Sequence, residues 1–201
     1  MKSRSIIFRQ DYLPLVRDGR KTQMRVRLRG KALSLAMEGG SDERLVQALT
    51  AHRCPLGDPG DELWVREKWA FLGTDMMRHG RTHSVQDAVI RYGDGEQRTI
   101  TSDWRNVEPL MAGDDRYRSM FYMPKWASRL TLVVKAVSVE RLSDITDEDA
   151  TEEGFIPDQG VCVEDGWRRR IAFLSSFLRP YEIANDANPW VFAVKFAVAS
   201  R

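Results

Sequence analysis

The stretch Leu130-Thr-Leu-Val-Val-Lys-Ala-Val-Ser-Val-Glu-Arg141 gives the strongest strand signal of the chain and decides its fold class. Its apolar and β-branched residues are typical of a strand packed in a sheet. Shorter strand signals lie at residues 5–8, 61–71, 88–92 and 189–198. No regular strand–helix–strand alternation and no Gly-rich phosphate loop accompany them. The pattern therefore predicts an α+β fold, a small mixed or barrel-like sheet of about five or six strands flanked by helices.

Helices are predicted between these strands. Residues 11–18 form the first, with Pro14 in its first turn and Gly19 as its stop. Residues 32–52 are helical with a break at 39–41, and residues 167–178 have an amphipathic stripe. The acidic segment 146–153 reads as a short helix that Thr146 caps and Gly154 ends.

Length and composition indicate one domain over residues 1–201 that contains insertions. The region from 73 to 120 is polar, predicted to be loop-rich and the likeliest place for disorder, with a hairpin turn at 93–95. A net charge of +2 excludes a general nucleic-acid coat, so any basic function must come from local clustering.

Two cysteines, Cys54 and Cys162, lie in no metal-ligand spacing and are expected to be free thiols in a reducing compartment. No apolar run has the length of a membrane span, and no export signal is visible. We therefore expect a cytoplasmic protein with no membrane contact, no metal site and no cofactor.

A cationic segment follows the first helix. Lys21, Arg25, Arg27 and Arg29 recur at odd positions, so in a strand they share one face, opposite a mostly apolar one. Such a wall suits an anionic or nucleotide-like ligand. The alternative is a solvated edge strand, because rows of cations also protect sheet edges. Lys21 acts as a general base only if burial or neighbouring cations lower its pKa.

Three other places could carry chemistry. Glu153 ends an acidic helix, where a solvated face is the simpler interpretation. A carboxylate at this end opposes the helix dipole, so a functional role is the alternative. Arg66 and Glu67 are adjacent charges in an apolar strand, where a binding role and a buried ion pair are equally good interpretations. Trp126, flanked by Lys125 and Arg129, has the composition of a base-stacking site, although a Trp that simply packs is the commoner case.

These segments, in this order, resemble the ASCH domain family, whose members have a PUA-like β-barrel. The matching segments are Gly19-Arg20-Lys21-Thr22 with Arg25, residues 59–67 (PGDELWVRE), residues 123–129 (MPKWASR), residues 145–154, and Asn188-Pro189-Trp190-Val191. The resemblance is to the prophage-associated branch in particular. It spans nearly the whole chain, except residues 31–52 and part of 73–118, so it implies a single ASCH/PUA-like domain over 1–201 with insertions at 31–52 and 73–118.

The resemblance implies a cationic cleft that binds RNA or modified nucleosides. One bacterial branch of the family hydrolyses N(4)-acetylcytidine with a Lys, a Thr and a Glu, and another member is reported to cleave RNA. By position the Lys is Lys21 and the Glu is Glu153, but the Thr position holds Met24. Methionine has no hydroxyl and cannot be the nucleophile, and Thr22 is expected on the opposite strand face.

The sequence therefore predicts an RNA- or nucleoside-binding protein rather than an enzyme. The expected ligand contacts are Lys21, Arg25, Arg66, Glu67, Trp126 and Arg129. A hydrolase or ribonuclease that uses Lys21 and Glu153 is the alternative, and a phage-associated structural protein with a degenerate pocket is the second one.

Overall fold

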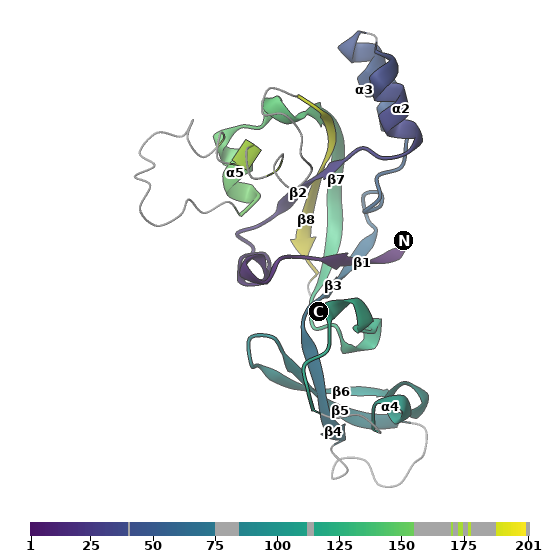
Figure 1. Cartoon of the computed structure of the whole chain (residues 1–201), viewed down its shortest axis with the longest axis vertical. Helices are drawn as coiled ribbons and strands as arrows, with labels where there is room; N and C mark the ends of the chain where they lie inside the picture. The colour runs from purple at the N-terminus through teal and green to yellow at the C-terminus, as the bar shows by residue number, and fades with distance from the viewer. Residues whose placement is uncertain are drawn as a thin grey trace. The chain divides into compact units, whose positions relative to one another are not determined.

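The computed structural model describes residues 1–39, 41–74, 85–111, 115–154, 170, 173, 174, 177 and 188–199. Their contacts divide the chain into two compact units (Figure 1). The first unit comprises Met1–Arg4, Asp11–Leu63 and Leu132–Arg201, and the second comprises Ser5–Gln10 and Trp64–Thr131. The predicted α+β class is confirmed, because both helices and strands contribute to the structure.

A five-stranded sheet has the order β1-β3-β7-β8-β2. Its strands are β1 (Ser3–Ile7), β2 (Gln23–Arg27), β3 (Glu62–Arg66), β7 (Thr131–Arg141) and β8 (Trp190–Val198). The strands predicted at 130–141 and 189–198 are thus confirmed. β8 runs antiparallel to both β7 and β2, with Ala193 opposite Ser138 on one side and Arg25 on the other. Its position between two strands explains why its first five residues are buried.

A second sheet of three antiparallel strands has the order β4-β5-β6. Its strands are β4 (Trp69–Thr74), β5 (Val85–Tyr92) and β6 (Gln97–Asp103). Among the described residues, the strands therefore form two open sheets, and no pairing of β1 with β2 closes the expected barrel. The single strand predicted over 61–71 is also wrong, because β3 ends at Arg66 and β4 begins in the other sheet.

The region predicted to be loop-rich, 73–120, holds β5, β6 and helix α4 (Trp104–Met111) in its described part. Alternate β5 residues Ala88, Ile90 and Tyr92 are completely buried, in a core that also contains Trp69 and Met123. The strand predicted at 88–92 is confirmed as part of β5, whereas β6 and α4 were not predicted. Half of the buried residues in this core come from outside the region, so local polarity alone did not indicate the second sheet. The predicted hairpin turn at 93–95 is confirmed between β5 and β6, with Gly95 at a φ of 87°.

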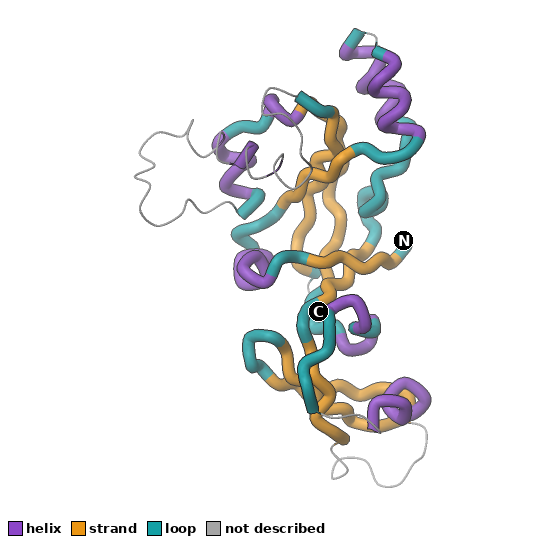
Figure 2. Tube along the Cα trace, viewed as in Figure 1, coloured by secondary structure: helices purple, strands orange, loops and turns teal. Residues whose placement is uncertain are grey.

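Several predicted helices are confirmed (Figure 2). A 3₁₀ turn, η1 (Gln10–Tyr12), leads into α1 (Leu13–Arg17), which has Pro14 in its first turn and is followed by Gly19 at a φ of 71°. Helices α2 (Lys31–Glu38) and α3 (Asp42–Thr50) are separated at the predicted break. The segment predicted at 167–178 lies outside the described residues except for 170, 173, 174 and 177.

Helix α5 (Asp147–Glu152) starts with a complete capping box. The Thr146 side chain accepts from the Asp149 backbone N–H, and the Asp149 side chain accepts from the Thr146 N–H. The predicted cap and the stop at Gly154, which has a φ of 75°, are both confirmed. Shorter 3₁₀ turns are η2 (Met120–Tyr122), η3 (Lys125–Ala127) and η4 (Leu142–Asp144).

None of the helices that the structure describes has both the length and the apolar character needed to cross a bilayer. Cys54 is a buried free thiol in the first unit, whereas Cys162 lies outside the described residues.

Candidate functional site

The polar face of β2 is its buried face. Lys21, Gln23 and Arg25 are 3%, 1% and 5% exposed, whereas Met24 and Val26 on the other face are half-buried. This reverses the expected pattern of an open row of cations, since Arg29 alone of the four is exposed. β2 does lie at an edge of its sheet, as the alternative predicted, but its cations are covered rather than solvated.

Lys21 lies at the C-terminal end of α5. Its Nζ donates to the backbone carbonyl of Glu153, to the Glu153 Oε2 at 2.9 Å and to the Gln23 carbonyl at 2.9 Å. A cation there satisfies a carbonyl that the helix leaves unpaired and interacts favourably with the helix dipole. Lys21 therefore explains why an acid can sit at this helix end, which the dipole alone disfavours. The Tyr12 ring also lies 5.0 Å from this Nζ.

Arg25 connects three carboxylates. Its Nη1 lies 3.2 Å from Glu153 Oε1, and its Nη2 lies 2.6 Å from Glu140 Oε1 and 3.3 Å from Asp149 Oδ2. These acids come from β7, from α5 and from the residue that follows α5, all more than a hundred residues after Arg25 in the sequence. We call the six residues Lys21, Gln23, Arg25, Glu140, Asp149 and Glu153 the β2 cluster. All of them belong to the first unit.

Gln23 has an unsatisfied acceptor in the middle of the β2 cluster. Its Nε2 donates to the Asp149 backbone carbonyl at 2.8 Å and to Asp149 Oδ1 at 2.9 Å. Both partners are acceptors, so the orientation of the amide is fixed. Its Oε1 is buried and has no hydrogen-bond partner in the structure. Leaving a buried acceptor unpaired costs about 1–3 kcal/mol, so this atom points to a missing donor.

Burial moves the two central ionisable groups toward their neutral forms. Desolvation lowers the pKa of Lys21, against the opposing effect of the Glu153 carboxylate. Desolvation also raises the pKa of Glu153, although Lys21 and Arg25 act against that shift. The Lys21 Nζ and the Glu153 Oε2 lie 2.9 Å apart, so burial shifts the pKa values of two directly paired groups in opposite directions.

Gly154 permits the close approach of Lys21 to the helix end. Its φ of +75° is rarely adopted by other residues, and an added Cβ would lie 3.0 Å from the Lys21 Cβ. The same Cβ would lie 3.2 Å from the Leu15 Cδ1. The position therefore requires glycine for both its conformation and its contacts.

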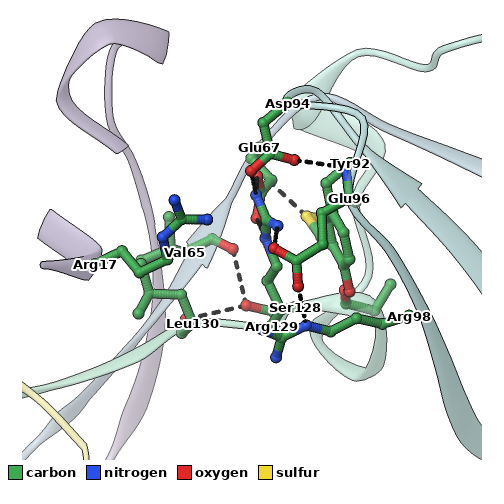
Figure 3. Close-up of polar contacts among 12 residues, drawn as sticks. Arg17, Val65, Glu67, Tyr92, Asp94, Glu96, Arg98, Ser128, Arg129 and Leu130 are labelled. Atoms are coloured by element: carbon green, nitrogen blue, oxygen red, sulfur yellow. Dashed lines mark hydrogen bonds and ion pairs between the residues drawn. The ribbon is translucent and has the colours of Figure 1, made fainter. Parts of the chain in front are cut away.

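Glu67 and Arg129 form a second buried cluster, in the second unit (Figure 3). Arg129 donates to both Glu67 oxygens, at 2.9 and 2.7 Å. It also donates to Glu96 and, at 2.8 Å, to Asp94, both in the β5–β6 hairpin turn. Its guanidinium lies 4.1 Å from the centroid of the Tyr92 ring. This arrangement is the buried ion pair that one interpretation of Arg66-Glu67 predicted. We call it the Arg129 cluster.

Arg66 and Trp126 also belong to the second unit. Arg66 Nη1 donates to the Phe121 carbonyl at 3.1 Å, and its guanidinium lies 4.8 Å from the Trp64 ring. Trp126 is half-buried and packs against the core around Trp69, which agrees with the interpretation of a Trp that simply packs. Their predicted ligand contacts stay predictions.

The structure therefore gathers Lys21, Arg25 and Glu153 at one place and Glu67 with Arg129 at another. Sequence reasoning missed Gln23, Glu140 and Asp149. Gln23 could have been found, since it alternates with Lys21 and Arg25, and Asp149 lies four residues before Glu153 on the same helix side. Glu140 has no local signal, because the strand between β7 and β2 is β8.

Met24 lies on the other face of β2 from Gln23 and Arg25, by strand alternation and burial. A hydroxyl at position 24 would then point away from the β2 cluster. The position of a threonine nucleophile implied by the family resemblance is therefore not on the face that carries Lys21 and Glu153.

Comparisons with known proteins found few likenesses. No family model matches the chain, and no curated protein matches it. One similar solved structure is an ASCH domain from Lactobacillus crispatus, at 11% identity and a TM-score of 0.40, covering 98% of this chain and 79% of that one. Another is a DUF984-family protein from Enterococcus faecalis, at 12% identity and a TM-score of 0.36. This second match covers 92% of the chain here but only 64% of the Enterococcus protein. At these scores neither likeness carries a conclusion about ligand or activity.

Proposed function

We propose that this chain is an ASCH-type protein with a PUA-like fold that binds RNA or a nucleoside, and that its β2 cluster holds the base. The observation that carries the proposal is the buried, unpartnered Oε1 of Gln23. It lies on the strand face of Arg25, beside a lysine and a carboxyl that burial shifts toward neutrality. An amino group of a nucleobase is a donor of the kind this acceptor lacks.

The charge of the β2 cluster favours a base over a phosphate. With all groups ionised, Lys21 and Arg25 supply +2 while Glu140, Asp149 and Glu153 supply −3, which leaves −1. A phosphate would meet net repulsion here, whereas the N–H edge of a base meets acceptors. This refines the sequence-based expectation of an anionic ligand on a cationic wall.

Calorimetric titration with cytidine and with acetylated cytidine tests the proposal. Gln23→Met keeps the length of the side chain but removes both amide groups, and we expect at least about tenfold weaker binding from one lost buried hydrogen bond. Gln47→Met is the matched control, because it makes the same substitution at an exposed glutamine of α3 and should leave affinity unchanged. Absence of nucleoside binding by the folded wild-type protein would overturn the proposal.

A hydrolase is the second candidate, and the opposite pKa shifts of Lys21 and Glu153 favour it. A neutral Lys21 amine would take a proton from water as the water attacks an acetyl amide, and Glu153 would protonate the leaving amine. The products are cytidine and acetate, with one water consumed. Lys21 Nζ has three acceptors around it, so the role requires the ligand to displace one of them.

Chromatography of acetylated cytidine after incubation tests this second function. Turnover by the wild type that disappears in Lys21→Met would support it. Met24→Thr is expected to add nothing, because residue 24 lies on the opposite strand face. No turnover of acetylated cytidine or single-stranded RNA would exclude both the amidohydrolase and the ribonuclease.

A further inference from the structure

We propose that the second unit carries a separate surface for single-stranded nucleic acid, on which Phe121 and Tyr122 stack the bases. Phe121 is 67% exposed and Tyr122 is 79% exposed. Large aromatic side chains are seldom left so open without a partner, and two adjacent ones form an apolar surface that needs an explanation. The inference goes beyond the proposed function, because it needs no ligand in the β2 cluster.

The backbone that carries the two rings is held in place. Both belong to η2, where the Ser119 side chain accepts from the Phe121 N–H and the Ser119 carbonyl accepts from the Tyr122 N–H. The next residue, Met123, is 2% exposed and belongs to the core of the second unit. The Phe121 carbonyl in turn accepts from Arg66. The rings are thus presented by an anchored turn, which lowers the entropy lost when bases stack on them.

The surrounding sequence has the charge that a nucleic acid requires. Between residues 115 and 125, Arg116, Arg118 and Lys125 supply +3 against one acid, Asp115, which leaves +2. These eleven residues therefore carry the same net charge as the whole chain.

A third aromatic of this segment already stacks with cations. Tyr117 has the Lys68 ammonium 4.6 Å and the Arg91 guanidinium 4.8 Å from its ring centroid. Its hydroxyl donates to the Tyr92 carbonyl at 3.1 Å. Aromatic faces alternating with Lys and Arg are what single-strand binding surfaces use, with stacking for the bases and cations for the phosphates. The cations make this partner a better fit than an apolar protein face.

Fluorescence anisotropy with a labelled uridine oligomer of about ten nucleotides, at about 50 mM salt, tests the surface. Replacing both rings, Phe121→Ala with Tyr122→Ala, should weaken binding at least about tenfold, because the stacking of two bases is lost. Both side chains are exposed, so the variant should fold. Met37→Ala is the matched control, because Met37 is 78% exposed but lies in the first unit.

A second pair of substitutions separates stacking from simple apolar contact. Phe121→Leu with Tyr122→Leu keeps apolar side chains without rings, and it should bind as weakly as the alanine pair. Equal binding by the wild type and the alanine pair, or full binding by the leucine pair, would overturn the inference. Binding to anionic phospholipid vesicles without binding to the oligomer would overturn it as well.

The two binding sites can be tested separately, because each has its own variant. Loss of oligomer binding in Gln23→Met but not in the alanine pair would overturn this inference while supporting the β2 cluster as the binding site. Loss in the alanine pair with unchanged cytidine binding would support both sites independently.

Discussion

The two buried clusters of this protein are built from similar side chains but differ in what their protons can do. In the Arg129 cluster, three carboxylates surround one guanidinium, which keeps its charge at any ordinary pH. In the β2 cluster, Glu153 pairs with Lys21 as well as with Arg25, and burial shifts the pKa of Lys21 and that of Glu153 toward the neutral form. Burial raises the pKa of Glu67 too, so the β2 cluster differs in having a titratable cation, Lys21, beside its buried carboxyl.

The difference suggests different roles. Arg129 binds both oxygens of Glu67 and both acids of the β5–β6 turn, so it connects the end of β3 to that hairpin. In the β2 cluster, the amide oxygen of Gln23 is left without a donor. A completed ion pair is typical of structural support, whereas a buried network with an unsatisfied polar atom is a candidate for a binding or catalytic site.

The largest effect is expected from breaking the fixed ion pair. Arg129→Met leaves the Glu67 carboxyl, which is 3% exposed, without its two-point partner. Removing one partner of a buried pair costs about 3–5 kcal/mol, measured as the free energy of unfolding in urea. The double variant Arg129→Met/Glu67→Leu should recover part of that loss. A loss under about 1 kcal/mol in the single variant would contradict the structural role.

A smaller, pH-dependent effect is expected in the β2 cluster. Lys21→Met should cost about 2 kcal/mol at neutral pH, because Arg25 still pairs with Glu153. The Lys21 pKa is lowered below 10.5 in the folded state, so the unfolded state binds more protons just below that value. The free energy of unfolding of the wild type should therefore rise with pH over that window, relative to Lys21→Met. If the free energy of unfolding changed with pH in the same way in both proteins, the lowered pKa of Lys21 would be contradicted.

The smallest effect on the free energy of unfolding is expected from replacing either of two glycines that have similar backbone conformations. Gly154 has a φ of +75° and Gly95 a φ of +87°, but an added Cβ meets nothing within 4 Å at Gly95 and lies 3.0 Å from Lys21 at Gly154. Both alanine variants pay the conformational cost of about 1 kcal/mol. Only Gly154→Ala should also change the alkaline pH profile of unfolding, because it displaces Lys21. Identical losses with unchanged profiles would show that the contact is unimportant.

The sequence predicted those parts of the fold that local patterns specify. The strands at 130–141 and 189–198, the stop at Gly19 and the capped helix after Thr146 all depend on neighbouring residues. The division of residues 61–71 between two sheets was not predictable in this way. Between the two strands, Glu67 pairs with Arg129, which lies 62 residues further along the chain and has no local signal in this segment.

In the candidate site, too, local patterns indicated some residues but not their distant partners. Lys21, Arg25 and Glu153 were suggested by charge placement and by resemblance, and the structure brings them together. Their burial could not be predicted from β2 alone, because the acids that cover its polar face come from α5 and β7. The sequence therefore indicated an open cationic wall where the structure has a closed, nearly neutral network.

A crystal structure of the protein soaked with cytidine tests the central claim most directly. The account predicts that the base binds in the β2 cluster, with its amino nitrogen about 3 Å from Gln23 Oε1. A nucleoside bound elsewhere, with only a water on Gln23 Oε1, would contradict the account and leave the β2 cluster a structural network like that of Arg129.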